Sequence, residues 1–550
     1  MKSSEHLEHE AAIINNWVNS CTRMHPHCSI LEKTDYLPTR VIDVMADGGD
    51  SIKLTLTSED AIGDPRYLAL SHCWGTTMPL SARTTLSCLD AHRKSINREA
   101  LPLSFVNFID IARRLGIQYV WIDSLCIIQD SPSDWEQEAA RMASVYSNAY
   151  ITVSASGSSD GRGGCHILDD ERALGPVDLE YSELEQSMYG EMEMKYRKFR
   201  VFTLSASPLS SILSTDPLNK RAWTLQEREL SPRVVHYSKD SIRWECRDLK
   251  ASLEFPWNDS LAFNNSQRIF DNGQLDHLTQ GLKSLETLST AEHSKALMQQ
   301  RLAWFDLVDR YTNRALTRQS DILPAISGIA QAVGRSTSDQ YYAGLWKSYL
   351  AQCLLWASAW SIDHGLATHS RPSTYLAPSW SWASVKGHIQ YLSWMLSAHS
   401  YNPDPDPTFV PTIRGITTEP AGSDPYGMLR GGVLHIEGKI KPAFTRNDGY
   451  AIRSERQDRE NVYSGQMTAV GEVRFDIPLC SDCAPPGRIN ILFILCCLNG
   501  KTFADGTFRT YGIALKSINL LQRRFERVGL VWGIDPDFWK EAPVMDLTIE

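Results

Sequence analysis

The feature that most constrains the fold is the regular alternation of strand and helix patterns between Tyr67 and Ser156. The helix patterns place apolar residues at i, i+3 and i+4, and the strand patterns are short, nearly continuous apolar runs. The alternating elements are expected at 67–74 (strand), 104–116 (helix), 118–122 (strand), 133–149 (helix) and 150–156 (strand). Such alternation predicts an α/β fold with a mostly parallel sheet and flanking helices.

The whole chain is too long for one core, since its 550 residues fit two or three domains. Downstream of the α/β region the sequence predicts a helical region and then a β-rich C-terminal region. The expected divisions are an N-terminal preface at 1–60, the α/β domain at 61–250, a linker or insertion at 251–300, helices at 301–400 and strands at 401–550.

Charge and composition argue against several classes of function. The net charge of −10 does not favour sequence-independent binding to nucleic acid. The start of the chain is polar and acidic, so we expect no secretory signal, a cytoplasmic location and free thiols. The longest apolar stretch, 344–360, is short and contains Lys347, which predicts a buried helix and no membrane span.

Polar residues follow two of the expected strands. Asp123, Cys126 and Gln129 come directly after the strand at 118–122, and His72 to Trp74 end the strand at 67–74. Sites in open α/β sheets lie beyond the carboxyl ends of the strands. If the two strands are neighbours, both groups share one edge. The alternative is that Asp123 and Gln129 only cap backbone groups and turn the chain.

The helix expected at 133–149 places Glu138 at the edge of its apolar stripe. Ser133 and Glu136 form a capping-box pattern, while Ser131 followed by Pro132 offers a competing start. A carboxylate that faces the protein needs a partner or has a raised pKa. Glu138 is therefore either an ion-pair partner, for example of Arg221, or a functional acid.

The segment 221–230 (RAWTLQEREL) repeats this arrangement. Trp223, Gln226, Glu227 and Leu230 fall on one face of a helix. A glutamine and a glutamate on that face indicate a polar network under or within a site. A solvated helix edge is the competing interpretation.

Three motifs, taken together, resemble the HET (heterokaryon incompatibility) domain of filamentous fungi. They are YLALSHCWG at 67–75, the long motif at 101–156, and RAWTLQERELSPRVVHYSKDSIRWEC at 221–246. Flanking segments such as DILPAISGIA, PSWSWAS and RFERVGLVWG also look like full-length members. The loop at 160–174 departs from the family, which usually has an apolar pair after the glycine, so the resemblance implies no role for this loop.

The resemblance implies a role in fungal non-self recognition, where fusion between unlike strains triggers programmed cell death. The HET domain is also distantly similar to the Toll/interleukin-receptor fold, whose enzymatic members use a glutamate to cleave NAD. Carried over by position, Glu138 is the candidate catalytic residue and Trp74 the candidate to stack on nicotinamide. The motif residues include Met142 and Tyr146, and the substrate-binding candidates are Ser71, Trp74, Asp123, Cys126, Gln129, Trp223, Gln226 and Glu227.

Two mechanisms remain open from the sequence. In the first, the domain hydrolyses NAD, which is then its substrate, and no other cofactor is assigned. In the second, it has no chemistry and signals by self-association or by binding other incompatibility proteins. Glu138 beside the 123–129 loop favours the first mechanism, and the lack of a dinucleotide-binding motif favours the second.

Other groups of reactive residues are weaker candidates. Cys126 with His72 and Asp123 has the composition of a thiol hydrolase, but free cysteines are often simply buried. The cluster CTRMHPHC offers Cys21, His25, His27 and Cys28, and CSDC offers Cys480 and Cys483. Each lacks the second half of a zinc motif, so packing is the preferred interpretation and no metal ligand is assigned. The glycine-rich segment 156–164 lacks Walker A spacing, and SWSW at 379–382 is expected in an aromatic core.

Overall fold

The structure is a computed structural model of the whole chain. It describes residues 4–29, 36–46, 48, 51–75, 78–165, 177–186, 192–201, 216–239, 241–253, 256–257, 290–359, 369–391, 411–446, 451–452, 471–477, 489–502 and 508–550. Two compact units are present. The first comprises 1–135, 145–219 and 231–272, and the second comprises 136–144, 220–230 and 273–550.

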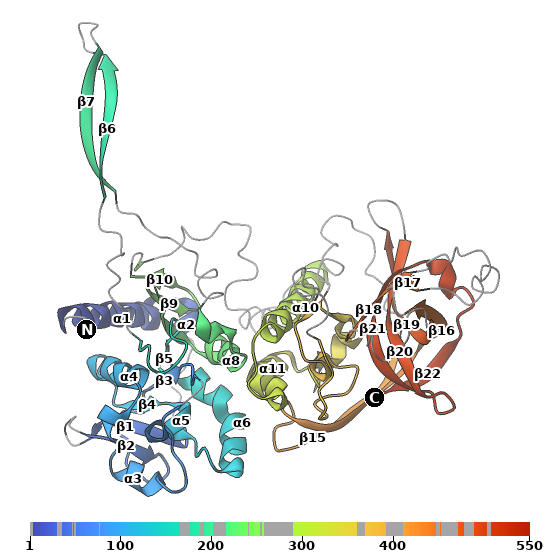
Figure 1. Cartoon of the computed structure of the whole chain (residues 1–550), viewed down its shortest axis with the longest axis horizontal. Helices are drawn as coiled ribbons and strands as arrows, with labels where there is room; N and C mark the ends of the chain where they lie inside the picture. Colours follow the sequence, from blue (N-terminus) through green and yellow to red (C-terminus); the bar gives the residue numbers. More distant parts are fainter. Residues whose placement is uncertain are drawn as a thin grey trace. The chain divides into compact units, whose positions relative to one another are not determined.

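The first unit is built on an eight-stranded sheet in the order β10-β9-β8-β5-β3-β4-β1-β2 (Figure 1). Its strands are β1 (Arg40–Ala46), β2 (Ser51–Leu56), β3 (Tyr67–Ser71), β4 (Tyr119–Trp121), β5 (Ile151–Ser154), β8 (Arg233–Tyr237), β9 (Ile242–Cys246) and β10 (Lys250–Ser252). The backbone of a separate hairpin, β6 (Val177–Gln186) with β7 (Met192–Val201), is also described.

The sheet is mixed, which corrects the expectation of a mostly parallel one. The four central strands, β4, β3, β5 and β8, pair in parallel. Both edges are antiparallel, through β1 and β2 on one side and β9 and β10 on the other. The reason is connection length, because β8–β9–β10 and β1–β2 are joined by short turns, which only antiparallel neighbours allow.

The order of the parallel strands defines a topological switch point, which is the place in the sheet where the strand order reverses. In chain order they are first β3, second β4, third β5 and fourth β8, so the sheet reads 2-1-3-4. The chain leaves β3 in one direction to reach β4 and returns on the other side to form β5. In doubly wound sheets ligands bind at the carboxyl ends of the two strands where this reversal occurs. Here these are the ends of β3 and β5, where Ser71 pairs with Ser154.

Helices of the first unit follow the apolar pattern of the sequence. Helix α4 (Leu103–Arg114) buries Phe105, Phe108 and Ile109, and Gly116 follows it with a φ of 69°. The remaining helices near the sheet are α1 (Ser4–Met24), α2 (Pro26–Ser29), α3 (Leu89–Lys94), α5 (Asp123–Cys126) and α6 (Pro132–Asn148).

Helix α6 begins at the earlier of its two predicted starts. Ser131 is the N-cap, its side chain accepts a hydrogen bond from the backbone N–H of Asp134, and Pro132 is at the first helical position. Proline fits there because that backbone nitrogen needs no partner inside the helix. The capping box at Ser133 and Glu136 was therefore the wrong start.

The second unit combines helices with a second eight-stranded sheet, in the order β15-β16-β19-β20-β21-β18-β17 with β22 pairing to β16 and β21. Its main helices are α8 (Trp223–Leu230), α10 (Thr290–Thr312), α11 (Pro324–Thr337) and the short α12 (Leu350–Cys353). Its strands are β15 (Thr412–Pro420), β16 (Leu429–Arg446), β17 (Ala451–Ile452), β18 (Gly471–Phe475), β19 (Ile489–Thr502), β20 (Phe508–Asn519), β21 (Arg524–Ile534) and β22 (Val544–Ile549). The predicted strand-rich C-terminal region is confirmed.

The segment 344–360 is not one helix, which corrects that expectation. It contains β12 (Leu345–Trp346), a helical turn, α12 and β13 (Trp356–Ser358). Gly344 has a φ of 93°, which helical backbone does not allow, and β13 pairs with β14 (Ile389–Tyr391). Among the helices that the structure describes, none is long and apolar enough to cross a bilayer.

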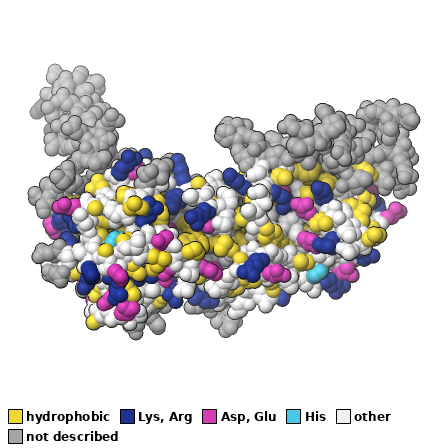
Figure 2. All heavy atoms as spheres, turned by 60° about the horizontal axis from the view of Figure 1, so that its bottom comes forward, with side chains coloured by type: hydrophobic (Ala, Val, Ile, Leu, Met, Phe, Trp, Pro, Cys, Tyr) yellow, Lys and Arg dark blue, Asp and Glu magenta, His cyan; other side chains and the backbone are white. Residues whose placement is uncertain are grey.

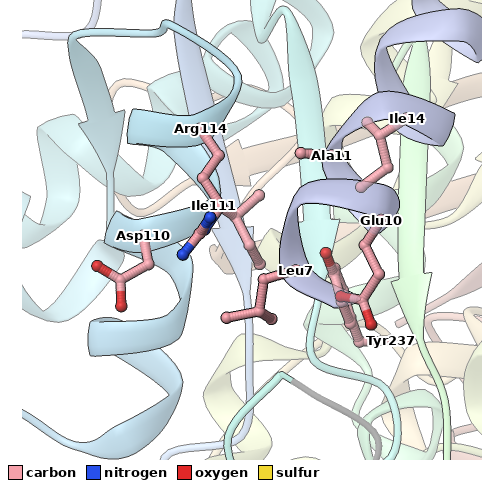
Figure 3. Close-up of a pocket in the computed structure, with 8 residues that line it drawn as sticks. All are labelled: Leu7, Glu10, Ala11, Ile14, Asp110, Ile111, Arg114 and Tyr237. Carbon is pink, nitrogen blue, oxygen red and sulfur yellow. The ribbon is translucent and has the colours of Figure 1, made fainter. Parts of the chain in front are cut away.

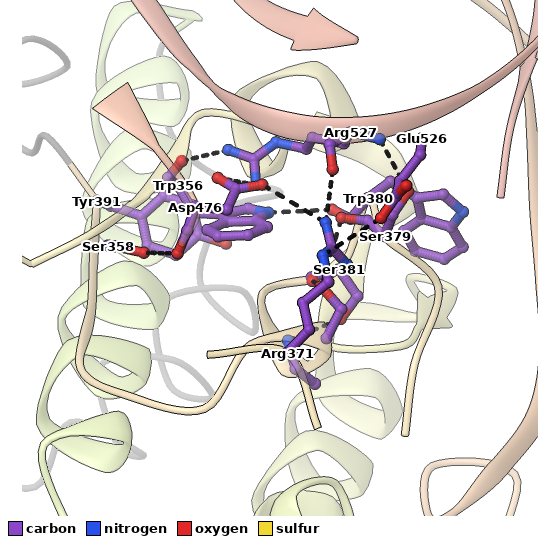
Figure 4. A network of polar contacts seen from close by, with 12 residues as sticks. Trp356, Ser358, Arg371, Ser379, Trp380, Ser381, Tyr391, Asp476, Glu526 and Arg527 are labelled. Carbon is purple, nitrogen blue, oxygen red and sulfur yellow. Dashed lines mark hydrogen bonds and ion pairs between the residues drawn. The ribbon is translucent and has the colours of Figure 1, made fainter. Parts of the chain in front are cut away.

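The SWSW segment lies in the core of the second unit, as predicted. Trp380 and Trp382 are fully buried in one cluster with residues of α10, α11 and the second sheet. Beside them lies a buried ion pair, Arg527 with Asp476, whose N–O distance is 3.1 Å. Figure 4 shows Arg527 reaching from β21 toward Trp356, over whose ring it stacks with Cζ 3.4 Å from the centroid.

Candidate functional site

The carboxyl ends of β3 and β4 bring three side chains of the two polar groups together. The strands are parallel neighbours, with Ala69 opposite Trp121. Just beyond them the indole Nε1 of Trp74 donates a hydrogen bond to Oδ2 of Asp123 at 2.8 Å. The other oxygen of Asp123 lies 3.7 Å from Nε2 of His72. The prediction that both groups share one edge of the sheet is confirmed.

Asp123 and Gln129 also contact backbone groups of the loop after β4, as expected if they cap backbone groups and turn the chain. Oδ1 of Asp123 accepts the N–H of Ser124 at 2.7 Å. The amide of Gln129 donates to the carbonyl oxygens of Asp123 and Ile127, at 3.1 and 2.9 Å. Asp123 and Gln129 therefore fold the loop after β4, and Asp123 in addition holds Trp74 in place.

Ser71 and Cys126 are buried members of the same edge. Ser71 ends β3 opposite Ser154 of β5, which places it at the switch point. Cys126 ends α5 and is 1% exposed, and its carbonyl oxygen accepts a hydrogen bond from Nε of Arg40 at 2.6 Å. This burial agrees with the preferred interpretation of Cys126 as a packed thiol, because a reagent has to reach a nucleophilic one.

The loop that departs from the family pattern packs against the end of the first motif. Gly75 has a φ of 71°, and a Cβ added there would lie 2.6 Å from Cβ of Asp160. The carbonyl of Gly161 accepts the N–H of Ser104 at the start of α4. The part of the loop up to Cys165 thus closes over Gly75, while residues 166–174 lie outside the described residues.

Glu138 lies in the part of α6 that belongs to the second unit. It is 2% exposed, as the helical spacing predicted, and its Oε1 lies 3.4 Å from Nη1 of Arg141. The ion pair is therefore formed within the helix and spans one turn. A catalytic role for Glu138 stays a prediction.

The polar face of α8 is buried, which overturns the interpretation as a solvated edge. Oε1 of Gln226 accepts the N–H of Gly328 in α11 at 2.8 Å, and Glu227 is also buried. Trp223 donates its indole N–H to Asp321 at 3.2 Å. Burial raises the pKa of Asp321, although the hydrogen bonds from Trp223 and Ser320 oppose this effect. The predicted polar network exists, and its partners come from α11 and the turn before it.

A second polar chain at the carboxyl ends of β5 and β8 was not predicted. The hydroxyl of Ser156 lies 2.7 Å from that of Ser154 and 3.4 Å from Nδ1 of His236. Nε2 of His236 lies 3.2 Å from Glu245 in β9. Ser156 is fully buried. Through Ser154, His236 and Glu245 the polar chain joins the neighbouring strands β5, β8 and β9. Ser156 and His236 are 80 positions apart, so their contact follows only from the order of the strands in the sheet. No local sequence motif marks this pair.

A small pocket lies between α1, α4 and the end of β8 (Figure 3). Leu7 and Ile14 come from α1, Ile111 and Arg114 from α4, and Tyr237 closes one side. None of the predicted site residues lines it, so we do not assign it to the candidate site.

Of the comparisons with known proteins, one gave a match. Residues 67–227 match the family model described as Heterokaryon incompatibility protein (HET). The chain contains a HET domain. No curated protein and no solved structure gave a match.

The HET domain begins at the first residue of β3 and ends inside α8. It therefore includes β3 and β5, the two strands beside the switch point, and every predicted site residue. The parallel strand β8 and the antiparallel edges formed by β1, β2, β9 and β10 lie outside the matched segment. The sheet that carries the HET domain is thus completed by residues before and after it.

Proposed function

We propose that the protein is a heterokaryon-incompatibility-type effector or regulator that acts in fungal non-self recognition and programmed cell death. The observation that carries this proposal is the HET match over 67–227. The site of action is cytoplasmic, and the partners are proteins rather than nucleic acid. Interspersed basic and acidic side chains on the face shown in Figure 2, with the net charge of −10, support this choice of partner.

The proposed mechanism is hydrolysis of NAD. The doubly wound core, with Trp74 and Asp123 at the strand ends, supports both a nucleotide ligand and the distant likeness to the Toll/interleukin-receptor fold. In the reaction, the glycosidic bond breaks and its electron pair leaves with nicotinamide, while water adds to C1′ of the ribose and loses a proton to solvent, which gives ADP-ribose. Glu138 is the carboxylate proposed to stabilise the developing oxocarbenium ion.

The alternative is a signalling module that self-associates and has no chemistry. Its supporting observation is the burial of Glu138 and its pairing with Arg141 at 3.4 Å. An ion-pair partner of this kind needs no substrate. In this case the polar residues at the strand ends only hold the fold.

The test is nicotinamide release from NAD by the purified full chain over a range of protein concentrations. Wild type is compared with Glu138→Gln, and with Glu136→Gln as a matched control, since Glu136 lies on the exposed side of the same helix. Release that is lost only in Glu138→Gln supports the enzyme. Equal release by all three proteins rules out Glu138 as the catalytic residue. Absence of release, together with concentration-dependent self-association in light scattering, supports the alternative.

A further inference from the structure

The structure brings Cys246 to three of the metal-binding side chains at the start of the chain, Cys21, His25 and Cys28. Cys21 lies in the last turn of α1, and His25 and Cys28 follow in the turn and in α2. Cys246, at the end of β9, lies against them although it follows His25 by 221 residues. The three sulfur atoms and one imidazole nitrogen all lie within 4.8 Å of one another.

The distances fit a tetrahedral zinc ion. Zinc–sulfur bonds of about 2.3 Å and zinc–nitrogen bonds of about 2.0 Å place neighbouring ligand atoms about 3.5–3.8 Å apart. Sγ of Cys246 lies 3.4 Å from Nδ1 of His25. All three cysteines are free and buried, and His25 is half-buried. The ligand atoms therefore need only a small contraction to surround an ion.

The surroundings suit three thiolates. Zinc bound by three thiolates and a neutral imidazole carries a net charge of about −1. Nε of Arg233 donates a hydrogen bond to Sγ of Cys21 at 3.2 Å, and Arg233 itself is buried. Such a cationic donor offsets the excess charge and orients the ligand.

We propose that Cys21, His25, Cys28 and Cys246 bind one zinc ion in a closed structural site. Soft thiolate ligands select zinc over magnesium or calcium, and four protein ligands leave no open position for a reacting water. The ion fastens α1 and α2 to the antiparallel edge of the first sheet. Trp17, one turn before Cys21, packs against Trp244, two residues before Cys246, with ring centroids 5.9 Å apart.

The first experiment is metal analysis of the purified full chain by mass spectrometry. We expect wild type to contain about one zinc per chain. Cys21→Ser and Cys246→Ser should each lose it. Cys88→Ser is the matched control, because Cys88 is another free cysteine of the first unit and lies outside the cluster. It should keep the zinc.

Two measurements on wild type protect the test against variants that fail to fold. Modification of the thiols with a mercurial should release the zinc to a colorimetric chelator. Replacement by Co²⁺ should give the charge-transfer and d–d bands of a tetrahedral cobalt thiolate. Wild type that contains no zinc and shows no such bands overturns the proposal. Zinc that is retained in both Cys21→Ser and Cys246→Ser overturns it as well.

Discussion

The guanidinium of Arg233 donates a hydrogen bond to the thiol of Cys21, and 212 residues separate the two. Arg233 begins β8, a parallel strand of the first sheet, and Cys21 lies in the last turn of α1. The same guanidinium lies over the ring of Tyr150, at 5.6 Å from its centroid. The start of the chain is thus anchored to the centre of the sheet through one buried cation.

This contact predicts that Arg233→Met weakens zinc binding without removing a ligand. Loss of a group that supports a metal ligand typically reduces affinity by about 10–100-fold. Competition with a chelator of known affinity measures the change. Arg66→Met is the control, because Arg66 also lies over Tyr150, at 5.1 Å, but pairs with Asp64. An affinity that falls equally in both variants would contradict the role given to Arg233.

The bond between Trp74 and Asp123 predicts coupled effects on stability. A hydrogen bond to a charged group contributes about 1.5–3 kcal/mol, and partial exposure of Asp123 reduces this value. In a double-mutant cycle with Trp74→Phe and Asp123→Ala, each of which removes one partner of the bond, we expect a coupling energy of about 0.5–1.5 kcal/mol. Urea unfolding of the four proteins gives this energy. Strictly additive losses would mean that the 2.8 Å contact does not contribute.

Gly328 in α11 predicts a steric effect. A Cβ at this position would lie 2.4 Å from Cβ of Ala143 in α6 and 2.8 Å from Oε1 of Gln226. Gly328→Ala should therefore lower the free energy of unfolding by about 1–3 kcal/mol, although alanine favours helix. Gly334→Ala in the same helix is the comparison, since its Cβ would first meet only the hydroxyl of Tyr426. Thermal unfolding should show the larger loss for Gly328→Ala, and the reverse order would refute this packing.

The buried pair of Arg527 and Asp476 predicts a large loss when one charge is removed. Both side chains are at most 1% exposed. Arg527→Met leaves a buried carboxylate without its main partner and should cost about 3–5 kcal/mol of unfolding free energy. Guanidinium unfolding measures it. The pair also orders its surroundings, because Nη2 of Arg527 donates to the carbonyl of Trp356 at 2.6 Å. If Arg527→Met lost less unfolding free energy than an ordinary surface variant, the assignment of a stabilising buried pair would be contradicted.

Asp476 also predicts a pH dependence. Burial raises the pKa of Asp476 to about 6, although the charges of Arg527 and Arg371 oppose the effect. The unfolded carboxyl has a pKa of about 3.9, so folding takes up a proton between these values. This contribution is fully present below about pH 4 and is lost as pH rises through about 6. Relative to Asp476→Asn, wild type should lose about 1–2 kcal/mol between about pH 5 and pH 7.5 in urea unfolding. A difference that does not change with pH would exclude the raised pKa.

The elements that follow from local pattern could be predicted from the sequence. The spacing of Phe105, Phe108 and Ile109 defines α4, and the apolar runs at β3, β4 and β5 define the strands. The shared edge of Trp74 and Asp123 was predicted on the condition that the two strands are neighbours, and the parallel pairing of β3 with β4 meets this condition. The antiparallel pairing of β1 with β4 was not predicted, because it joins segments that lie far apart in the sequence and no local pattern marks it.

The proposed metal site shows most clearly what local pattern cannot reveal. Cys21, His25, His27 and Cys28 were recognisable as ligand types, but a short cluster that lacks the second half of a zinc motif also occurs in ordinary packing. Cys246 could be added only when the β8–β9 hairpin was placed beside α1. The Ser156–His236–Glu245 chain is similar, since Ser156 follows β5 while His236 and Glu245 belong to β8 and β9. Cys480 and Cys483 lie outside the described residues.

Helix α6 contributes residues 136–144 to the second unit, and its two ends belong to the first. The segment that carries Glu138 therefore cannot be exchanged between proteins as an independent folding unit. A chimera that transplants 67–227 without α11 would leave Ala143 and Gln226 without the helix backbone they pack on. Grafting experiments on this protein should move α11 together with the HET domain, because otherwise the side chains that α11 covers become exposed in the recipient.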